Sequence, residues 1–585
     1  MKPLLRLKPY LVRYKKTLML GILTVIGTNL FSIAQPLFLG YAIDELKQGI
    51  ETKTYVSGDL LMWAGLIVGF TFVAGFFMFL TRQTIIVVSR HIEFDLRNDL
   101  LAHLQKLPYS YFQNKPTGDL MAHATNDISA VRNVLGPGIM YPSDTILTFI
   151  LVLIMMLTRD WMLTLLVLIP LPLVSIVVYR VSKVIHTKFN ERQEQFSKLT
   201  TKAQENLSGI RVIKSYVREQ FEIDDFKKLS WEYMKKNLVL AKVQSFLWPL
   251  MFGLVGCSII IAIYFGGVKV IEGSMTIGTL SAFMSYLLML IWPMIAFGWV
   301  LNLLQQGAAS MKRLAAIIDT VPEIRDTNTT DQSIKTIEGD IEFRDMTFTH
   351  KSAQQPTLSR INLKVEKGMT LAVVGYTGTG KSTLVNLIPR LYDVTEGQLL
   401  IDGNDVRTVP LAILRSCIGY VPQETFLFSE TIAENIRYGV DGDSADISQP
   451  AQISQISKDV NEFPKQFETM IGERGITLSG GQKQRTSIAR AIMREPSILI
   501  LDDALSSVDT YTEEEILNRL KQFMAGRTSI IISHRISTVK DADLIVVLDK
   551  GEIVERGTHD DLVAHGGIYA DLHQKQLLEK ELESM

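Results

Sequence analysis

The chain has 585 residues, which is too long for a single domain. Its formal net charge of −1 excludes the basic excess of nucleic-acid-binding proteins, so no nucleic acid partner is expected. The two cysteines, Cys257 and Cys417, stand far apart in unlike contexts, which excludes a disulfide framework or a cysteine metal cluster.

Apolar segments recur through the first half of the chain. A helix needs about 20 apolar residues to cross a bilayer. After a basic segment at residues 1–16, the first apolar run is too long for a signal peptide and is interpreted as a retained membrane helix. The sequence therefore predicts an α-helical membrane domain in a lipid bilayer. Its six predicted spans are residues 17–42, 58–81, 139–157, 161–182, 246–270 and 277–303.

The links between these spans alternate in length and charge. Short links follow the first, third and fifth spans, whereas the long second and fourth links are rich in basic residues such as Arg90 and Lys188. Basic residues close to span ends favour the cytoplasmic side, so both termini are expected in the cytoplasm. Pro, Gly or Ser-Gly at residues 107–121 and 205–216 interrupt the long helical links and predict a short helix at each tip.

Few polar residues interrupt the spans, and their roles stay open. Asp144 is ionisable at membrane depth, which is typical of a substrate-contacting group, but it follows "GPGIMYPS" and also suits an interfacial position. Trp248, Trp292 and Trp299 suit either a cavity lining or packing and anchoring at the interface.

The second half contains a phosphate-binding pattern, "VVGYTGTGKST" at residues 373–383. It lies between a strand-like "TLAVV" and a helical "TLVNLIPRLY", which favours a P-loop over an ordinary tight turn. The glycines let backbone N–H groups surround phosphates, Lys381 neutralises them, and Ser382 is a Mg²⁺ ligand. The predicted phosphate-binding residues are Gly375, Tyr376, Thr377, Gly378, Thr379, Gly380, Lys381, Ser382 and Thr383.

Two further segments belong with this loop. "SILILDDALSSVD" at residues 497–509 begins with a strand-like run that ends at Asp502. This strand would neighbour the P-loop strand, and Asp502 would hold Mg²⁺. In "LSGGQKQRTSIARAI" at residues 478–492 the glycines open a helix, whose free N–H groups are suited to an anion. The second half is therefore predicted to be an α/β P-loop NTPase domain.

Together these motifs resemble an ABC exporter half-transporter, in which one six-helix membrane domain is fused to one nucleotide-binding domain; the resemblance covers residues 1–575. "GERG" at 472–475 is similar to the X-loop of exporters, and the breaks at 107–121 and 205–216 would be coupling helices. In family order the other motifs are the P-loop (375–382), the Q-loop at Gln423, the signature "LSGGQ" (478–482), the Walker B residue Asp502, the D-loop "SSVD" (506–509) and the switch His534.

The resemblance implies the ligands ATP and Mg²⁺, with Gln423 near Mg²⁺ and the attacking water and His534 at the γ-phosphate. In the family, ATP lies between the P-loop of one nucleotide-binding domain and the signature helix of another. This chain has one of each, so a second half-transporter is expected. The signature residues Ser479, Gly480, Gly481 and Gln482 would complete the ATP site of that partner. The expected domains are residues 1–16 (cytoplasmic segment), 17–305 (membrane domain), 306–337 (linker), 338–575 (nucleotide-binding domain) and 576–585 (tail).

Two positions depart from the family pattern. Asp503 stands where the general-base Glu is expected, and its side chain is about 1 Å shorter, a misplacement that costs roughly a hundredfold in rate. His350, in "MTFTH", stands where an aromatic residue stacks on adenine. We interpret this as a degenerate ATP site with an intact signature, as in one subunit of heterodimeric bacterial multidrug exporters. The alternative is a conservative exchange in an active homodimer.

The expected activity is ATP-driven export of amphiphilic drugs across a bacterial plasma membrane. Two alternatives remain, one within this class and one outside it. The first is a homodimeric exporter of lipids or peptides. The second is a membrane protein in which ATP gates a pore or a bound partner, and substrate stimulation of ATP hydrolysis separates a pump from such a gate.

Overall fold

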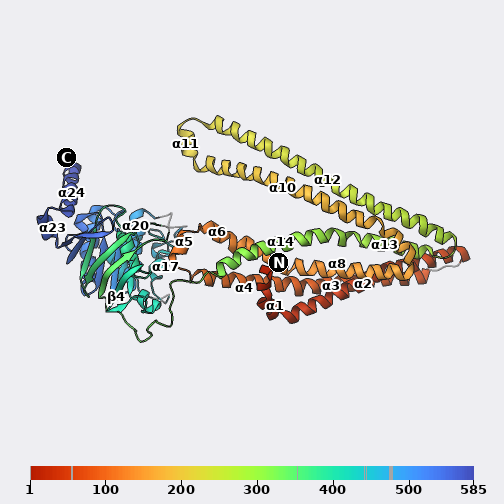
Figure 1. Ribbon diagram of the computed structural model, residues 1–585, viewed down its shortest axis with the longest axis horizontal. Coiled ribbons are helices and arrows are strands. Elements are labelled where there is room, and N and C mark those ends of the chain that lie inside the picture. The colour runs from red at the N-terminus through yellow and green to blue at the C-terminus, as the bar shows by residue number, and fades with distance from the viewer. Residues whose placement is uncertain are drawn as a thin grey trace. The chain divides into compact units, whose positions relative to one another are not determined.

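The computed structural model of the chain describes residues 2–53, 57–351, 353–440, 442, 445–472 and 478–584. The chain forms two compact units. The first comprises Met1–Gln105 and Thr117–Thr320 and is helical; the second comprises Lys106–Pro116 and Val321–Met585 and contains the β-strands (Figure 1).

The first unit is built from long helices. Five helical stretches are long and apolar enough to cross a membrane, judged by length and composition: Lys15–Thr52, Gly58–Leu104, Thr117–Arg159, Glu219–Ile271 and Ile277–Ile318. The elements of this unit are η1 (Lys2–Leu7), α1 (Lys8–Arg13), α2 (Lys15–Thr52), α3 (Ser57–Thr81), η2 (Arg82–Ile86), α4 (Val87–Leu104), α6 (Thr117–Ala122), η3 (His123–Asp127), α7 (Ile128–Leu135), α8 (Pro137–Arg159), α9 (Trp161–Leu168), α10 (Pro170–Ser208), α11 (Ile210–Ser215), α12 (Glu219–Ile271), α13 (Ile277–Met289) and α14 (Ile291–Ile318).

Five of the six predicted spans lie within these five stretches, and the predicted count of six is not confirmed. The predicted span at 161–182 is divided at Ile169, between α9 and α10. Pro170 is the first residue of α10 and has no N–H to donate to the preceding turn, so it begins a helix more readily than it continues one.

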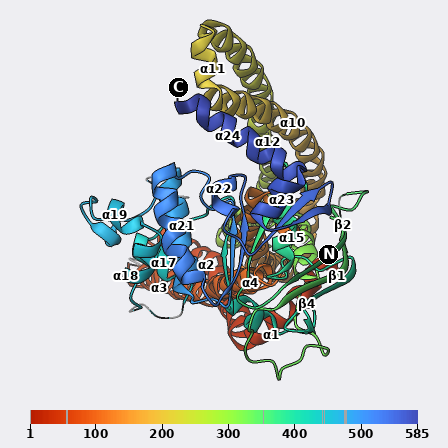
Figure 2. The same cartoon turned by 90° about the vertical axis from the view of Figure 1, so that its left-hand side faces the viewer.

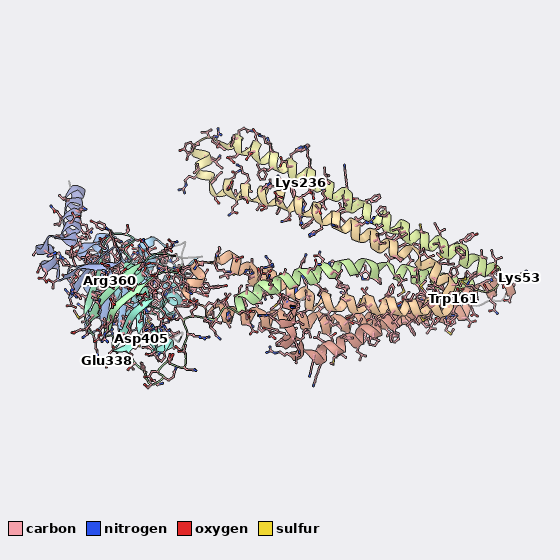
Figure 3. The ribbon with its side chains drawn as sticks, in the orientation of Figure 1. Lys53, Trp161, Lys236, Glu338, Arg360 and Asp405 are labelled. Carbon is pink, nitrogen blue, oxygen red and sulfur yellow. The ribbon has the colours of Figure 1, made fainter. Side chains whose placement is uncertain are left out.

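The predicted break at residues 205–216 is confirmed as a short helix, α11. Gly209 ends α10 and precedes α11, and α10 and α12 run side by side from it (Figure 1). Lys236 of α12, labelled in Figure 3, donates a hydrogen bond of 3.3 Å to Gln195 Oε1 of α10. At the tip, the side chains of Val212 and Tyr216 are exposed.

Asp144 has a partner within its own unit. Asn29 Nδ2 donates a hydrogen bond of 2.8 Å to Asp144 Oδ1, and the Thr148 hydroxyl donates to Asn29 Oδ1. Nearby in sequence, the ring of Tyr141 meets Trp299 edge-on at 5.1 Å between centroids. The hydrogen bond to Asn29 does not test a substrate contact of Asp144, which stays a prediction. The side chain of Trp248 lies outside the described residues.

The second unit holds two sheets. One has four antiparallel strands in the order β2-β1-β4-β5, and the other has six strands in the order β10-β9-β3-β8-β7-β6. The strands are β1 (Ile341–Phe348), β2 (Leu358–Val365), β3 (Thr370–Val374), β4 (Glu396–Ile401), β5 (Asn404–Asp405), β6 (Ile418–Val421), β7 (Ile498–Asp502), β8 (Thr528–Ile532), β9 (Leu544–Asp549) and β10 (Glu552–Gly557). The helices are α5 (Tyr109–Gln113), α15 (Lys381–Leu387), α16 (Leu411–Ser416), α17 (Ile432–Arg437), α18 (Ser448–Ile453), α19 (Ile456–Val460), η4 (Gln466–Glu468), α20 (Gly480–Met493), α21 (Thr510–Met524), α22 (Ile536–Val539), α23 (His559–His565) and α24 (Ile568–Ser584).

The six-stranded sheet is parallel except for β10 and is buried on both faces. Successive residues of β3 lie on opposite faces of the sheet: Leu371 and Val373 belong to one apolar core, and Ala372 and Val374 belong to the other. Buried parallel strands of this kind read as continuous apolar runs, as "ILIL" does in β7. Their carboxyl ends meet at one edge of the sheet, and the motifs follow them there.

Candidate nucleotide-binding site

The predicted P-loop connects β3 to α15 and depends on its glycines. Gly375, Gly378 and Gly380 have φ angles of 145°, 82° and 100°, a region that glycine adopts without steric cost. A Cβ at Gly375 would lie 2.2 Å from the Leu548 carbonyl oxygen. The loop is thus held in a tight curve against the end of β9, with its N–H groups at the start of a helix.

Lys381, the first residue of α15, folds back across this loop. Its Nζ donates hydrogen bonds of 2.9 Å and 2.8 Å to the carbonyl oxygens of Gly375 and Tyr376, and the residue is only 7% exposed. Burial lowers the pKa of Lys381, against the opposing effect of the Asp502 and Asp503 carboxylates. A buried ammonium bonded to neutral carbonyls fits an anionic phosphate as its counter-charge.

Ser382 and Asp502 lie together, as a Mg²⁺ site requires. The Ser382 hydroxyl donates a hydrogen bond of 3.1 Å to Asp502 Oδ1, and Asp502 is 2% exposed. Burial raises the pKa of Asp502, and the bond from Ser382 opposes that rise. A hydroxyl and a carboxylate are the hard oxygen ligands that Mg²⁺ prefers, so these residues fit the ion.

The expectation that Asp502 comes from the strand next to the P-loop strand is wrong. β8 lies between β3 and β7, so β7 is two strands away. Because Ser382 sits in the first turn of α15, beyond the carboxyl ends of the strands, its hydroxyl reaches across the end of β8 to Asp502.

Asp503 has an unusual backbone that its neighbours fix. Its φ is 50°, in the left-handed region that Asp tolerates better than most residues. Its N–H donates 2.9 Å to the Ile532 carbonyl of β8, and its carbonyl accepts 3.0 Å from the Ser506 hydroxyl. These hydrogen bonds therefore define the backbone at this position.

Three other predicted site residues lie at strand ends. His534 follows β8 and Gln423 follows β6, and both are exposed. His350 follows β1 in the other sheet; its ring is half-buried and meets Phe348 and Tyr392 edge-on, at 4.8 Å and 5.4 Å between centroids. The structure thus gathers the P-loop, Asp502, Asp503, Gln423 and His534 at one sheet edge, and His350 comes from the second sheet.

The signature segment opens α20 with a reciprocal cap. Ser479 Oγ accepts 3.2 Å from the Gln482 N–H, and Gln482 Oε1 accepts 3.0 Å from the Ser479 N–H. A Cβ at Gly481 would lie 3.0 Å from the Ser507 carbonyl, so this glycine lets the D-loop pack closely. Ser479 and Gly480 are exposed and free to face another molecule. Residues 473–475 of the predicted X-loop lie outside the described residues.

Sequence reasoning missed residues that link the motifs. Gln484, 4% exposed, donates 2.9 Å to Ser506 Oγ and accepts 2.9 Å from the Ser507 N–H, so it joins the signature helix to the D-loop. Glu513, 3% exposed, accepts from the Arg535 guanidinium and from the Thr538 hydroxyl. The position of Gln484 inside "LSGGQKQR" was a usable signal, whereas Glu513 lies in an ordinary helical segment.

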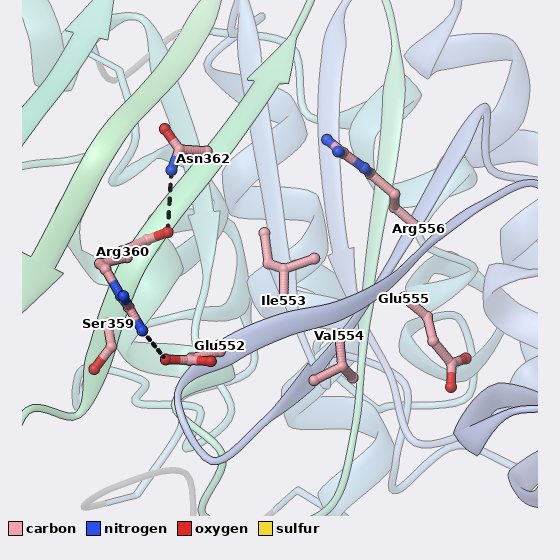
Figure 4. Close-up of a pocket in the computed structure, with 8 residues that line it drawn as sticks. All are labelled: Ser359, Arg360, Asn362, Glu552, Ile553, Val554, Glu555 and Arg556. Carbon is pink, nitrogen blue, oxygen red and sulfur yellow. Dashed lines mark hydrogen bonds and ion pairs between the residues drawn. The ribbon is translucent and has the colours of Figure 1, made fainter.

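A separate hollow of about 400 Å³ lies between β2 and β10 (Figure 4). Arg360 and Glu552 form a 3.3 Å ion pair across it, and Arg360 O accepts from Asn362 Nδ2 at 3.2 Å. The residues that line it include none of the predicted site residues, so this hollow is distinct from the site at the sheet edge.

Comparison with known families matches both halves of the chain. The family described as "ABC transporter transmembrane region" matches residues 18–294, and the family described as "ABC transporter" matches residues 358–506.

Curated relatives align over nearly the whole length. The probable multidrug resistance ABC transporter ATP-binding/permease protein YheI of Bacillus subtilis is 36% identical, covering 98% of this chain and 96% of that protein. The multidrug resistance-like ATP-binding protein MdlA of Escherichia coli is 35% identical over 95% and 93%. The ATP-dependent lipid A-core flippase of Syntrophus aciditrophicus is 39% identical over 85% and 82%.

A solved structure agrees in fold. The structure of a bacterial Atm1-family ABC exporter with ATP bound superposes with a TM-score of 0.78 at 26% identity, covering 96% of this chain and 98% of that one.

Proposed function

The chain belongs to the ABC transporter family, as an exporter with its membrane and ATP-binding domains in one polypeptide, and from this membership we propose that it is one half of a heterodimeric multidrug exporter. It is a multi-pass inner-membrane protein whose ATP hydrolysis is coupled to transport. ABC exporters act as dimers, so the open question is the identity of the second half.

The observation that carries the proposal is Asp503 at the end of β7, beside an otherwise complete set of phosphate and metal ligands. Its backbone is fixed by the bond from its N–H to Ile532 O, at 2.9 Å. We infer that this bond keeps the main chain from advancing to compensate for the missing methylene. A carboxylate set back by about 1 Å positions water poorly, and such a misplacement lowers the rate roughly a hundredfold.

The proposed ligand is ATP with Mg²⁺. The P-loop N–H groups and Lys381 would hold the phosphates, and Ser382, Asp502 and Gln423 would hold the metal. When bound, Mg²⁺ neutralises charge on the β- and γ-phosphate oxygens. His350 offers an imidazole in place of the usual aromatic ring at the adenine. We expect this site to retain ATP and to hydrolyse it slowly.

The signature residues complete the other site in this proposal. Ser479 and Gly480 are exposed at the start of α20, where free N–H groups and the helix dipole favour a phosphate. They would meet the ATP held by the P-loop of a different half-transporter, one that carries the Walker B Glu. Turnover at that second site would drive transport.

We also propose that both termini lie in the cytoplasm and that α5 and α11 are the coupling helices. The exposed Val212 and Tyr216 at the tip containing α11 suit docking onto another surface. The proposed cargo is a small amphiphilic molecule, which the names of YheI and MdlA as multidrug resistance proteins support.

A homodimeric lipid exporter is the second candidate. The relative from Syntrophus aciditrophicus, named as a lipid A-core flippase, is 39% identical and favours it. In that case Asp503 would itself be the general base, and one chain would suffice for activity.

Hydrolysis of ATP by the purified full-length chain separates the two candidates. The chain is assayed alone and with candidate half-transporters from the same genome, as wild type, Asp503→Glu and Asp503→Asn. The heterodimer predicts slow turnover alone, restoration by one partner, and little change from Asp503→Asn in the restored complex. Brisk turnover of the chain alone that Asp503→Asn abolishes would establish the homodimer instead.

A further inference from the structure

The C-terminal helix α24 is fastened to the edge of the six-stranded sheet at its first residues. Glu555 of β10 accepts hydrogen bonds from the N–H groups of Ile568 (2.5 Å) and Tyr569 (3.1 Å). The Tyr569 side chain is fully buried, and its hydroxyl lies 2.7 Å from His559 Nδ1. These contacts fix the direction in which α24 leaves the sheet.

One face of α24 packs against the apolar core of the second unit, and its next turn lies beside the segment that carries the predicted switch His534. Ile568 and Leu572 pack against the apolar core that includes Ile536 and Val539 of α22. Gln576 follows at the same four-residue spacing, so it occupies the next position on that face. Its side chain is half-buried, in contrast to the exposed Gln574.

Gln576 bonds to the backbone on both sides of Arg535. Its Nε2 donates to the His534 carbonyl oxygen, and its Oε1 accepts 2.8 Å from the Ile536 N–H. A side-chain amide has both a donor and an acceptor and can satisfy such a pair at once. Figure 2 shows α22 and α24 close together in the second unit.

The segment around His534 is also held by a charged contact of its neighbour Arg535. Arg535 donates to Glu513, and it also donates 3.3 Å to the Val508 carbonyl of the D-loop. These contacts restrain the Arg535 side chain. Gln576 instead restrains the main chain that carries the His534 imidazole.

The same helix also touches the P-loop. The Tyr376 hydroxyl donates 3.4 Å to Asp571 Oδ2, and Lys575 forms a 2.7 Å ion pair with Asp571. Asp571 and Gln576 lie in consecutive turns of α24. The helix therefore contacts both the loop that precedes Lys381 and the segment that carries His534.

We propose that Gln576 is a positioning residue that sets the His534 imidazole toward the γ-phosphate, with α24 as the rigid support that relates the switch to the P-loop. This rests on the γ-phosphate contact proposed for His534. The helix that follows the last strand is then a part of the nucleotide site, and it makes the site sensitive to whatever binds or displaces α24.

The test compares Gln576→Ala, Gln576→Glu, His534→Ala and the control Gln574→Ala in the full-length chain. Gln574 has the same side chain on the same helix but is exposed, so its removal leaves the switch untouched. The first readout is the ratio of the MgADP to the MgATP dissociation constant, which isolates recognition of the γ-phosphate. The second is hydrogen exchange in the peptide that contains Ile536.

We expect Gln576→Ala to lower this ratio toward the value of His534→Ala, with little further loss in the double variant. Exchange at Ile536 should rise about fivefold or more, the shift expected from one net hydrogen bond. Gln576→Glu keeps an acceptor for the Ile536 N–H but places a carboxylate against the His534 carbonyl, so it should lower the ratio with a smaller rise in exchange. Gln574→Ala should match wild type in both readouts.

Two results would overturn the inference in distinguishable ways. If His534→Ala lowers the ratio while Gln576→Ala and Gln576→Glu behave like Gln574→Ala, or weaken MgATP and MgADP equally, Gln576 has no positioning role and the proposed switch stands. If His534→Ala leaves the ratio unchanged, the proposed γ-phosphate contact itself is wrong, and the inference falls with it.

Discussion

The Tyr392 hydroxyl donates a hydrogen bond of 2.8 Å to Gln113 Oε1 in α5. The Tyr392 ring also meets the rings of Tyr109 in α5 and of His350, at 6.0 Å and 5.4 Å between centroids. Tyr392 is buried, and burial raises the pKa of its phenol, so it remains a protonated donor at neutral pH. One side chain thus joins a proposed coupling helix to the ring proposed to face adenine.

Tyr392→Phe should therefore weaken coupling while leaving nucleotide binding intact. The variant keeps the ring contacts and loses one hydrogen bond, a net loss of about 1 kcal/mol. We expect the ratio of drug-stimulated to basal ATP hydrolysis in proteoliposomes to fall up to about fivefold, with an unchanged dissociation constant for MgATP. Gln113→Ala should give the same loss, and the double variant little more. Additive losses would mean that the two residues act separately.

The sequence was sufficient to locate the nucleotide motifs because each is a local pattern with a local cause. The P-loop glycines are required where they stand by positive φ angles, and Ser479 and Gln482 cap the helix that they begin. These constraints act over a few residues, so spacing alone reveals them. The same holds for the five apolar stretches of the first unit.

Contacts between distant segments were not predictable in this way. Gln576 bonds to residues about 40 positions earlier, and one glutamine in a polar helix has no local signature. The order of strands was also hidden, because the pattern of β8 does not tell that it lies between β3 and β7. At Ile169 the hydropathy of the segment favours one span, and the conformational preference of Pro170 divides it.

The P-loop glycines offer a graded test of the phosphate loop. Gly375→Ala places a Cβ 2.2 Å from the Leu548 carbonyl, whereas Gly378→Ala meets nothing within 4 Å. The Gly378 variant should lose about 1–2 kcal/mol of stability from its left-handed backbone alone. The Gly375 variant adds a backbone clash, so we expect a larger loss and no MgATP binding. Thermal unfolding and nucleotide titration measure both, and equal effects of the two variants would contradict the close fit of the loop against β9.

Removal of Mg²⁺ tests the pairing of Ser382 with Asp502. The hydroxyl lies 3.1 Å from the carboxylate, which suits two ligands of one ion. Chelation with EDTA should weaken ATP binding by wild type. In Ser382→Ala, the change in the binding free energy of ATP on removal of Mg²⁺ should fall to about a third or less of its wild-type value. Ser416→Ala is the matched control, because its hydroxyl contacts its own segment, donating 2.8 Å to Ile413 O in α16 and lying 3.8 Å from Cys417 Sγ. Full Mg²⁺ dependence in Ser382→Ala would exclude the serine as a ligand.

Comparing the loss of two helix caps distinguishes an effect on stability from an effect on function. Ser479 caps α20 and Thr558 caps α23, each with a reciprocal capping box. Loss of either cap by substitution with Ala should cost about 1 kcal/mol of stability. Ser479 is also proposed to meet the ATP of the partner half-transporter, whereas Thr558 is remote from the signature in sequence and packs at α23. In the reconstituted heterodimer we therefore expect Ser479→Ala to lower ATP hydrolysis at least about tenfold, beyond its effect on folding, and Thr558→Ala to leave it within about twofold of wild type. If both variants lose activity only in proportion to their loss of stability, the signature of this chain does not serve a hydrolytic site, and the division of labour between two different subunits would have to be abandoned.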